Sequence, residues 1–238
     1  MKEYLVSKEE SLFIDTNINY VIDNNVNNIL VKSGVTTNLL TYNVTEGLNF
    51  KIDVEKDAVV NLYQIVQTDN LTNINENIYL LEQGATVNNI IVLLGTKEAK
   101  LNSNISIYHN VGNTFSDLKT YTIVKDYANI KLGNNAYIKN KAAGSVARQS
   151  SKGLSLSKNG TILIDPNLFI DEYDVMASHG VAMGSLNKDD LFYLMSRGLT
   201  KEEASQIVIM GFIMPLLEAV DNKNYSEEIS KRFKENLQ

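Results

Sequence analysis

A short pattern recurs along the first two thirds of the chain and constrains the fold more than any other feature. It consists of an aliphatic residue, three turn-forming residues, a small residue, any residue and a second aliphatic residue. It occurs at 54–60, 81–87, 124–130, 132–138 and 156–162. In a β-solenoid, each coil turns several corners, where a small side chain fits the bend and an aliphatic residue stacks on the next coil.

The spacing of the pattern agrees with one coil per repeat. Ala58 and Ala85 are 27 residues apart, and Ala136 and Gly160 are 24 residues apart. Short apolar alternations separated by polar turn clusters predict strands between the corners, and no helical period of ten residues interrupts them before residue 175. The repeat alone fits a parallel β-helix and an antiparallel sandwich with similar turns about equally well.

The last sixty residues have a helical pattern instead. Asn187 is placed to cap a helix over 188–196 that ends at Gly198, and Thr200 with Glu203 forms a capping box for a helix reaching Val220. A third, charged helix is expected to run from Glu227 to about residue 236. We therefore expect a β-helix core over 1–176 and a small helical domain over 177–238.

Composition excludes several classes of function. A formal net charge of -6 argues against a nucleic-acid binder, although 127–164 has six basic and no acidic residues. The apolar run 207–217 is too short to span a bilayer, and the N-terminus lacks the apolar core of a signal peptide. These features predict a cytoplasmic protein that binds neither membranes nor nucleic acids.

The chain offers few groups for catalysis. There is no cysteine, and the two histidines are His109 and His179. His109 is expected to be structural, whereas His179 is surrounded by small residues, as in a site approached by a ligand or another chain. The acids Asp171 to Asp174 lack the rest of an EF-hand loop, and phosphate-loop, zinc-protease and nucleophile-elbow motifs are absent. We expect a protein that is not an enzyme.

The region from 154 to 204 resembles the C-terminal core of the SufB/SufD family of iron–sulfur cluster assembly proteins. The family pattern P-x-L-x-I, D-V-x-x-S-H-G-A-x-x-G and L-F-Y-L-x-S-R-G, followed by E-A, is matched with one substitution, Val181. The matching positions are Pro166, Leu168, Ile170, Asp174, Val175, Ser178, His179, Gly180, Gly184, 191–194, 196–198, Glu203 and Ala204.

This resemblance implies a right-handed parallel β-helix followed by helices that dock the ABC-type ATPase SufC, in which ATP hydrolysis takes place. It also implies pairing, either with a second copy or with a SufB-like subunit. The docking residues carried over are Leu191, Phe192, Tyr193, Arg197 and Glu203.

Departures from the family pattern point to a SufD-like member. The cysteine that SufB-like members carry before the P-x-L motif falls near Asn159, and Gly180 stands where they have a glutamate. Without a thiolate, the chain alone cannot hold a conventional four-cysteine cluster. We expect no cofactor bound by the chain alone, and His179 as a candidate metal ligand to a transient iron–sulfur cluster shared with a partner.

Two alternatives remain at this stage. The first is a structural homodimer without cluster chemistry. The second, less favoured, is a β-helical enzyme acting on polysaccharide, for which the acids at 171–174 would have to line an open groove.

Overall fold

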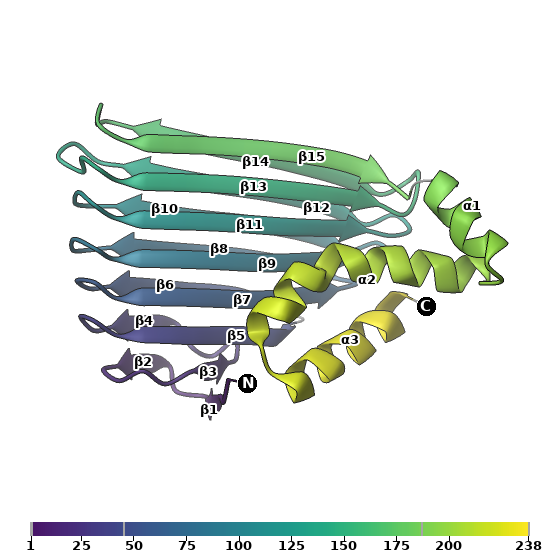
Figure 1. Ribbon diagram of the computed structural model, residues 1–238, viewed down its shortest axis with the longest axis horizontal. Coiled ribbons are helices and arrows are strands. Elements are labelled where there is room, and N and C mark those ends of the chain that lie inside the picture. The colour runs from purple at the N-terminus through teal and green to yellow at the C-terminus, as the bar shows by residue number, and fades with distance from the viewer. Residues whose placement is uncertain (1, 45, 187, 238) are drawn as a thin grey trace.

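The chain forms a parallel β-solenoid followed by three helices (Figure 1). The computed structural model describes residues 2–44, 46–186 and 188–237. Odd-numbered strands form an eight-stranded sheet, here sheet A, and even-numbered strands form a seven-stranded sheet, here sheet B. All strand pairs are parallel, which confirms the predicted fold class and excludes the antiparallel sandwich.

The strand bounds show that the coils lengthen after the first turns. Sheet A contains β1 (Leu5–Ser7), β3 (Tyr20–Ile22), β5 (Thr36–Val44), β7 (Val59–Thr68), β9 (Thr86–Gly95), β11 (Phe115–Val124), β13 (Val146–Ser155) and β15 (Met176–Ser185). Sheet B contains β2 (Ser11–Ile14), β4 (Asn28–Val31), β6 (Gly47–Val54), β8 (Leu71–Leu80), β10 (Lys100–His109), β12 (Asn129–Ile138) and β14 (Thr161–Ile170).

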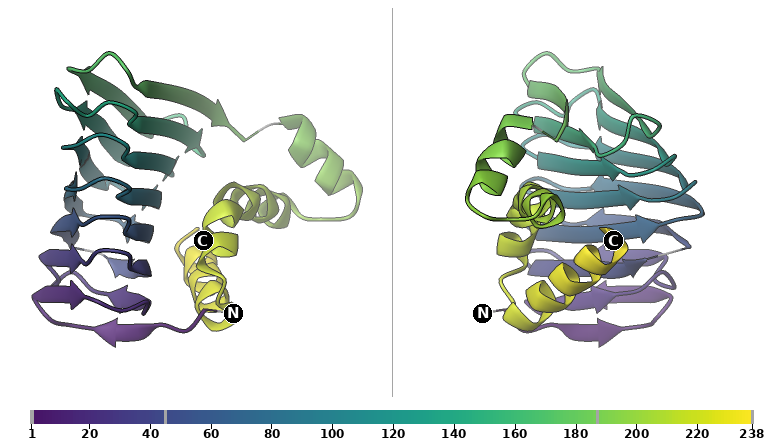
Figure 2. Two further views of the ribbon diagram at one scale, coloured as in Figure 1. Left: turned by 60° about the vertical axis from the view of Figure 1, so that its left-hand side comes forward. Right: turned by 90° about the vertical axis from the view of Figure 1, so that its right-hand side faces the viewer.

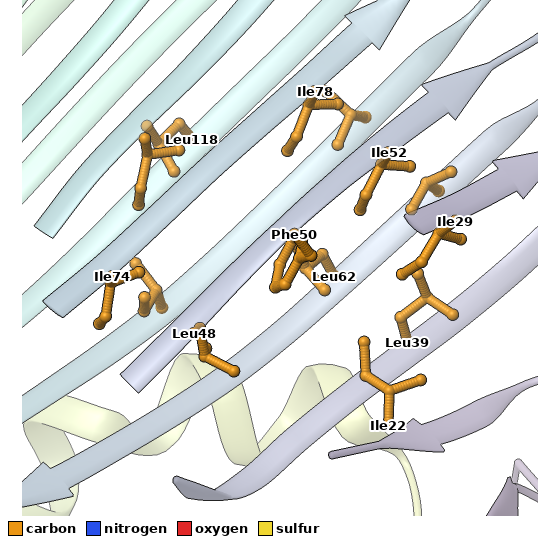
Figure 3. Packing of buried hydrophobic residues seen from close by; sticks show 14 of the residues in the cluster. Ile22, Ile29, Leu39, Leu48, Phe50, Ile52, Leu62, Ile74, Ile78 and Leu118 are labelled. Carbon is orange, nitrogen blue, oxygen red and sulfur yellow. The ribbon is translucent and has the colours of Figure 1, made fainter. Parts of the chain in front are cut away.

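Alternation along each strand separates the solenoid interior from its outer faces. Along β6 the residues Leu48, Phe50 and Ile52 are buried while the intervening side chains are more exposed. Their register partners on the neighbouring coils continue the same inward rows, so aliphatic side chains stack along the axis (Figure 3). This stacked interior is the main hydrophobic core.

Most of the repeated patterns are corners, as the sequence predicts. Ala58 and Ala85 are fully buried, and each follows a residue with positive φ, Asp57 at 55° and Gly84 at 77°. The pattern at 132–138 is an exception, because it lies inside β12. Its Asn134 and Asn135 resemble turn residues in sequence, but they bond to side chains of other strands, namely Ser151 and Asn104.

The helices cover the outer face of sheet A. They are α1 (Lys188–Ser196), α2 (Lys201–Val220) and α3 (Lys223–Leu237). Buried residues of α2 and α3, including Ile213 and Phe233, pack on outward residues such as Tyr63 and Tyr121. Sheet B has no such helical cover, and α1 stands away from the solenoid (Figure 2).

Two expected boundaries differ from the structure. The predicted domain boundary at 176/177 falls at the start of β15, so the solenoid continues to Ser185. The third helix begins at Lys223 rather than at Glu227. The capping box of α2 is confirmed, because Thr200 Oγ1 accepts from the amide of Glu203 and the Glu203 carboxylate accepts from the amide of Thr200. The predicted cap Asn187 lies outside the described residues.

The helix α2 is longer than the apolar run in it suggests. By length and hydropathy alone α2 meets the criteria for a membrane span. It nevertheless contains Pro215 and packs one side on sheet A through Ile209, Ile213 and Leu216. On its other side, Ile207 and Met214 are exposed.

The N-terminal segment fastens the helices to the first coils. Lys2 Nζ donates to the Ala219 carbonyl at 3.0 Å, and Tyr4 Oη donates to the Val220 carbonyl at 3.0 Å. The Tyr4 ring also packs edge-on against Tyr225. These bonds satisfy carbonyls at the C-terminal end of α2, which a helix leaves without internal partners.

Candidate functional site

The last coil of the solenoid is open. Among the described residues, no strand follows β14 in sheet B or β15 in sheet A, so each ten-residue strand is an edge. Nothing in the described chain covers the inward-facing side chains of these strands. They are Ile162, Ile164, Pro166, Leu168 and Ile170 from β14, and Ala177, His179, Val181, Met183 and Ser185 from β15. We call this surface the open end.

The open end is unusually apolar for an exposed surface. Val181 is 45% exposed and Met183 53% exposed, although both point in the direction that is buried in every lower coil. Met183 lies over Gly153, where an added Cβ would come within 2.4 Å of its sulfur. Long flat edges with apolar side chains are typical of surfaces that pair with another chain.

The single ionisable side chain among the inward residues of the open end is His179. Its register partner one coil below is Gln149, which is buried, and both side chains face the interior side. The structure therefore places His179 on a strand, near the middle of an exposed apolar surface. The alternation of Ala177, His179, Val181 and Met183 was the signal that could have revealed this strand.

Two opposite corners flank the open end. The corner between β14 and β15 holds the acids Asp171, Glu172 and Asp174, and the corner between β13 and β14 holds the exposed Lys158. Glu172 accepts hydrogen bonds from the backbone amides of Tyr173 and Lys141, which lower the pKa of its carboxyl. The acids lie on the outside of a corner and line no groove, so the structure offers no support for a polysaccharide-cleaving site.

The basic residues of 127–164 do not form one patch. Arg148 and Lys152 lie on the outer face of sheet A, each over an aromatic ring, whereas Lys131 lies on the outer face of sheet B. Lys139, Lys141 and Lys158 are in corners. The solvated-face interpretation therefore fits better than an anion-binding stripe.

The helix α1 carries most of the residues expected to dock a partner. Phe192 is 75% exposed and Tyr193 58% exposed, whereas Leu191 is half-buried. The Arg197 guanidinium lies 5.3 Å from the centre of the Tyr193 ring and donates to its hydroxyl at 3.3 Å. These side chains form an apolar and cationic group on α1, and Figure 2 shows that α1 stands away from the strands of the solenoid.

Glu203, the fifth predicted docking residue, has a structural role in the described chain. Its carboxylate accepts from the amide of Thr200 at 2.8 Å and from the Thr200 hydroxyl at 3.0 Å. These bonds lower the pKa of the carboxyl. Glu203 therefore caps α2, whereas the other four predicted docking residues lie in α1 or directly after it.

Within the described residues, no group of three or more His, Asp or Glu side chains is arranged to hold a metal ion. One imidazole at the open end is a chemically suitable ligand for iron, but any further ligands would have to come from a second chain.

The second histidine belongs to the core. His109 is fully buried, with Nδ1 2.8 Å from Thr114 Oγ1 and Nε2 2.9 Å from Ser116 Oγ. Burial lowers the pKa of its imidazole to about 4. Both ring nitrogens are engaged and out of reach of solvent, which agrees with the structural role expected from the sequence.

Comparison with known proteins relates this architecture to one family. Residues 11–212 match the family model described as "SUF system FeS cluster assembly, SufBD core domain". The chain is 30% identical over 187 residues to the iron–sulfur cluster assembly protein SufD of Bacillus subtilis (strain 168), covering 79% of this chain and 41% of that protein.

Other relatives give the same result. SufBD family iron–sulfur cluster assembly proteins of Staphylococcus saprophyticus and Staphylococcus epidermidis are each 25% identical over 158 residues, covering 66% of this chain and 34% of the relative. The chain thus spans about two fifths or less of the length of these relatives. The matched region contains nearly the whole solenoid together with α1 and half of α2. The chain belongs to the SufBD core-domain family of iron–sulfur cluster assembly proteins.

Proposed function

We propose that the chain is a SufD-like scaffold subunit of an iron–sulfur cluster assembly complex. In this proposal it is not an enzyme and works in the cytoplasm. It pairs with a second subunit through the open end, docks a SufC-type ABC ATPase through α1, and contributes His179 to a cluster site at the paired surface. The observation that carries the proposal is the open end, an apolar surface with two unpaired strand edges and one imidazole.

Pairing through the open end has a preferred direction. If β15 of two subunits pairs antiparallel about a two-fold axis, the acidic corner with Asp171 and Asp174 lies against the other subunit's corner with Lys158. A parallel arrangement of two copies would bring like-charged corners together, which costs free energy. Antiparallel pairing also satisfies the free backbone groups of both edges. The same surface suits a SufB-like subunit with a matching edge.

The ATPase dock is proposed for α1 because its aromatic side chains, Phe192 and Tyr193, are largely exposed in the described part of the chain. Phe192 and Tyr193 are large aromatic residues beside a cationic Arg197, a combination enriched in the centres of protein interfaces. The nine residues of α1 gain little from packing on the rest of the molecule, so a partner is the simplest source of their stability.

The pairing proposal is tested by Met183→Lys, with Met195→Lys as a matched control on α1. Both methionines are about half exposed, so neither lysine should unfold the chain. We expect light scattering to find the wild type and Met195→Lys as dimers, or as complexes with a SufB-like subunit, and Met183→Lys as a monomer. Equal association of all three proteins would contradict the proposal.

The docking proposal is tested with the SufC-type ATPase of the same organism. We expect Phe192→Ala and Arg197→Ala to weaken co-purification at least tenfold, while Glu203→Gln has a smaller effect through the cap of α2. Unchanged co-purification of the first two variants would contradict docking through α1.

A structural homodimer without cluster chemistry is distinguished by reconstitution. The assembled complex is loaded anaerobically with iron and sulfide, as wild type and as His179→Ala. Loss of bound iron in the variant supports the ligand role, and equal loading favours the purely structural role.

A further inference from the structure

The side chain beneath His179 is partly unsatisfied. Gln149 lies on β13 and is 5% exposed, and its Nε2 donates to the carbonyl of Asn167 at 3.3 Å. Its Oε1 is buried, with no hydrogen-bond partner among the described atoms. A buried carbonyl oxygen without a donor is unfavourable, so a nearby donor is expected to use it.

The register limits which neighbour on the stacked row can supply that donor. The inward row runs from Asn89 through Leu118 and Gln149 to His179, one residue on each coil. Leu118, directly below, is an alkyl side chain and cannot donate. His179, directly above, carries a ring N–H. Because Nε2 of Gln149 is committed to the Asn167 carbonyl, the orientation of the amide is set and Oε1 is left for a different neighbour.

We propose that Gln149 is a positioning residue for His179. Its buried side-chain carbonyl accepts a hydrogen bond from one ring nitrogen, which fixes the tautomer and turns the other nitrogen, with its lone pair, toward the open end. In the described structure Oε1 has no partner, so the proposed bond requires the exposed His179 side chain to turn toward Gln149. The value of this bond for holding iron rests on the proposed function.

The chemistry of imidazole explains why such a partner matters. A neutral imidazole has one donor nitrogen and one acceptor nitrogen, and only the acceptor can bind a metal. Metal-binding histidines commonly donate their other N–H to a carbonyl or carboxylate, which holds the ring in place. When a second subunit covers the open end, water is excluded and this hydrogen bond becomes stronger.

The two histidines of the chain make the test direct. In protein labelled with ¹⁵N-histidine at a pH where both rings are neutral, His109 is an internal reference because its ring is buried and bonded on both sides. We expect wild type to show two ring N–H protons protected from exchange and one dominant tautomer for each ring. His179→Ala identifies the second signal.

Substitutions of Gln149, with Gln64 as a control position, distinguish an effect on the position of the His179 ring from a general loss of stability. Gln149→Met keeps the length of the side chain and removes the acceptor, so we expect loss of the His179 ring proton and a mixture of tautomers, with His109 unchanged. Gln149→Glu keeps an acceptor oxygen and should retain the signal. Gln64→Met removes the buried, inward-facing glutamine of β7, far from the open end, and should leave both signals of His179 in place.

Two results would overturn the inference. One is a wild-type His179 ring with no protected proton and the tautomer mixture of free histidine, a measurement that needs no variant to fold. The other is an unchanged His179 signal in folded Gln149→Met.

A separate measurement, Fe²⁺ binding by the assembled complex, tests the proposed function. If it holds, Gln149→Met should weaken Fe²⁺ binding by the assembled complex roughly tenfold or more. A complex that binds no iron despite a fixed His179 tautomer would contradict the proposed function and leave the positioning role intact.

Discussion

Among single residues, Glu76 is the least expected, because its carboxyl is fully buried among uncharged groups. Gln64 Nε2 donates to it at 2.6 Å, and Asn89 Nδ2 donates at 3.3 Å. Burial raises the pKa of the carboxyl from 4.5 to about 7, against the smaller lowering effect of the two amides. No cation is paired with it in the described chain, so the neutral acid is favoured.

A pH dependence of stability follows from this carboxyl. Since the pKa is higher in the folded state, the proton is held more tightly by the folded chain, and stability is lost as pH rises toward 7 and above. We expect Glu76→Gln to be more stable than wild type at pH 8.5, by about 3 kcal/mol, the free energy equivalent of the shift. Urea unfolding at pH 8.5 and at pH 5 measures this.

The control for this measurement is Asn61→Asp, which adds a carboxyl to the outer face of β7, the strand that carries the Glu76 partner Gln64. It should show no comparable change with pH. A Glu76→Gln variant with the same stability as wild type at pH 8.5 would contradict a buried neutral acid.

At the scale of elements, α2 is attached to sheet A by a few fully buried side chains. Ile213 is 0% exposed, whereas Ile207 of the same helix is 49% exposed. Removing three carbons from Ile213 leaves a cavity between α2 and the sheet, so we expect Ile213→Ala to lower the free energy of unfolding by about 2–5 kcal/mol. Ile207→Ala should change it by less than about 1 kcal/mol. Thermal and urea unfolding distinguish the two, and equal effects would contradict this packing.

Helices were better predicted from the sequence than the last strand, for a physical reason. The ends of α1 and α2 are marked locally: Gly198 has a φ of 94°, and Thr200 caps α2. The strand β15 lacks comparable local signals, because Gly180 and Gly184 on its outer side have no neighbours to contact. Local sequence patterns therefore predict no strand for this segment, which the expected boundary at 176/177 places in the helical domain.

The candidate site, too, could be predicted from local sequence patterns only in part. The family motif identified His179, and exposed aromatic residues of α1 could be predicted. The apolar surface around His179 depends on which strands lie at the end of the stack, and Gln149 lies thirty residues before His179 in the sequence. Only the register between coils brings them together. The bonds from Lys2 and Tyr4 to α2 are likewise invisible to local patterns.

For the whole molecule, two buried groups oppose each other in their response to acid. His109 has a lowered pKa, so its contribution is present above its ordinary value of 6.5 and is lost as pH falls toward 4. The contribution of Glu76 to stability changes in the opposite direction, because it is lost as the pH rises from about 4.5 to about 7. Over the shared range their effects largely cancel.

This balance predicts that the stability of the wild type and that of Glu76→Gln depend differently on pH. We expect the stability of the wild type to be nearly constant between pH 5 and 6.5 with respect to these groups, and that of Glu76→Gln to rise by about 1.4 kcal/mol per pH unit, the slope for one proton. Chemical denaturation across that range measures the slope. A flat profile for both proteins would contradict the opposing pair.

The two ends of the solenoid differ in the length of their edge strands. In the terms of polymer chemistry the molecule is a monofunctional unit, because only one of its ends is suited to join another molecule. At the first coil, β1 and β2 span only three and four residues and are bordered by charged residues of the segment 8–10. Such short charged edges resist strand addition, whereas β14 and β15 offer ten residues each. If the open end pairs as proposed, a molecule with one pairing end forms only pairs. Raising the concentration should therefore fill the dimer without producing fibres.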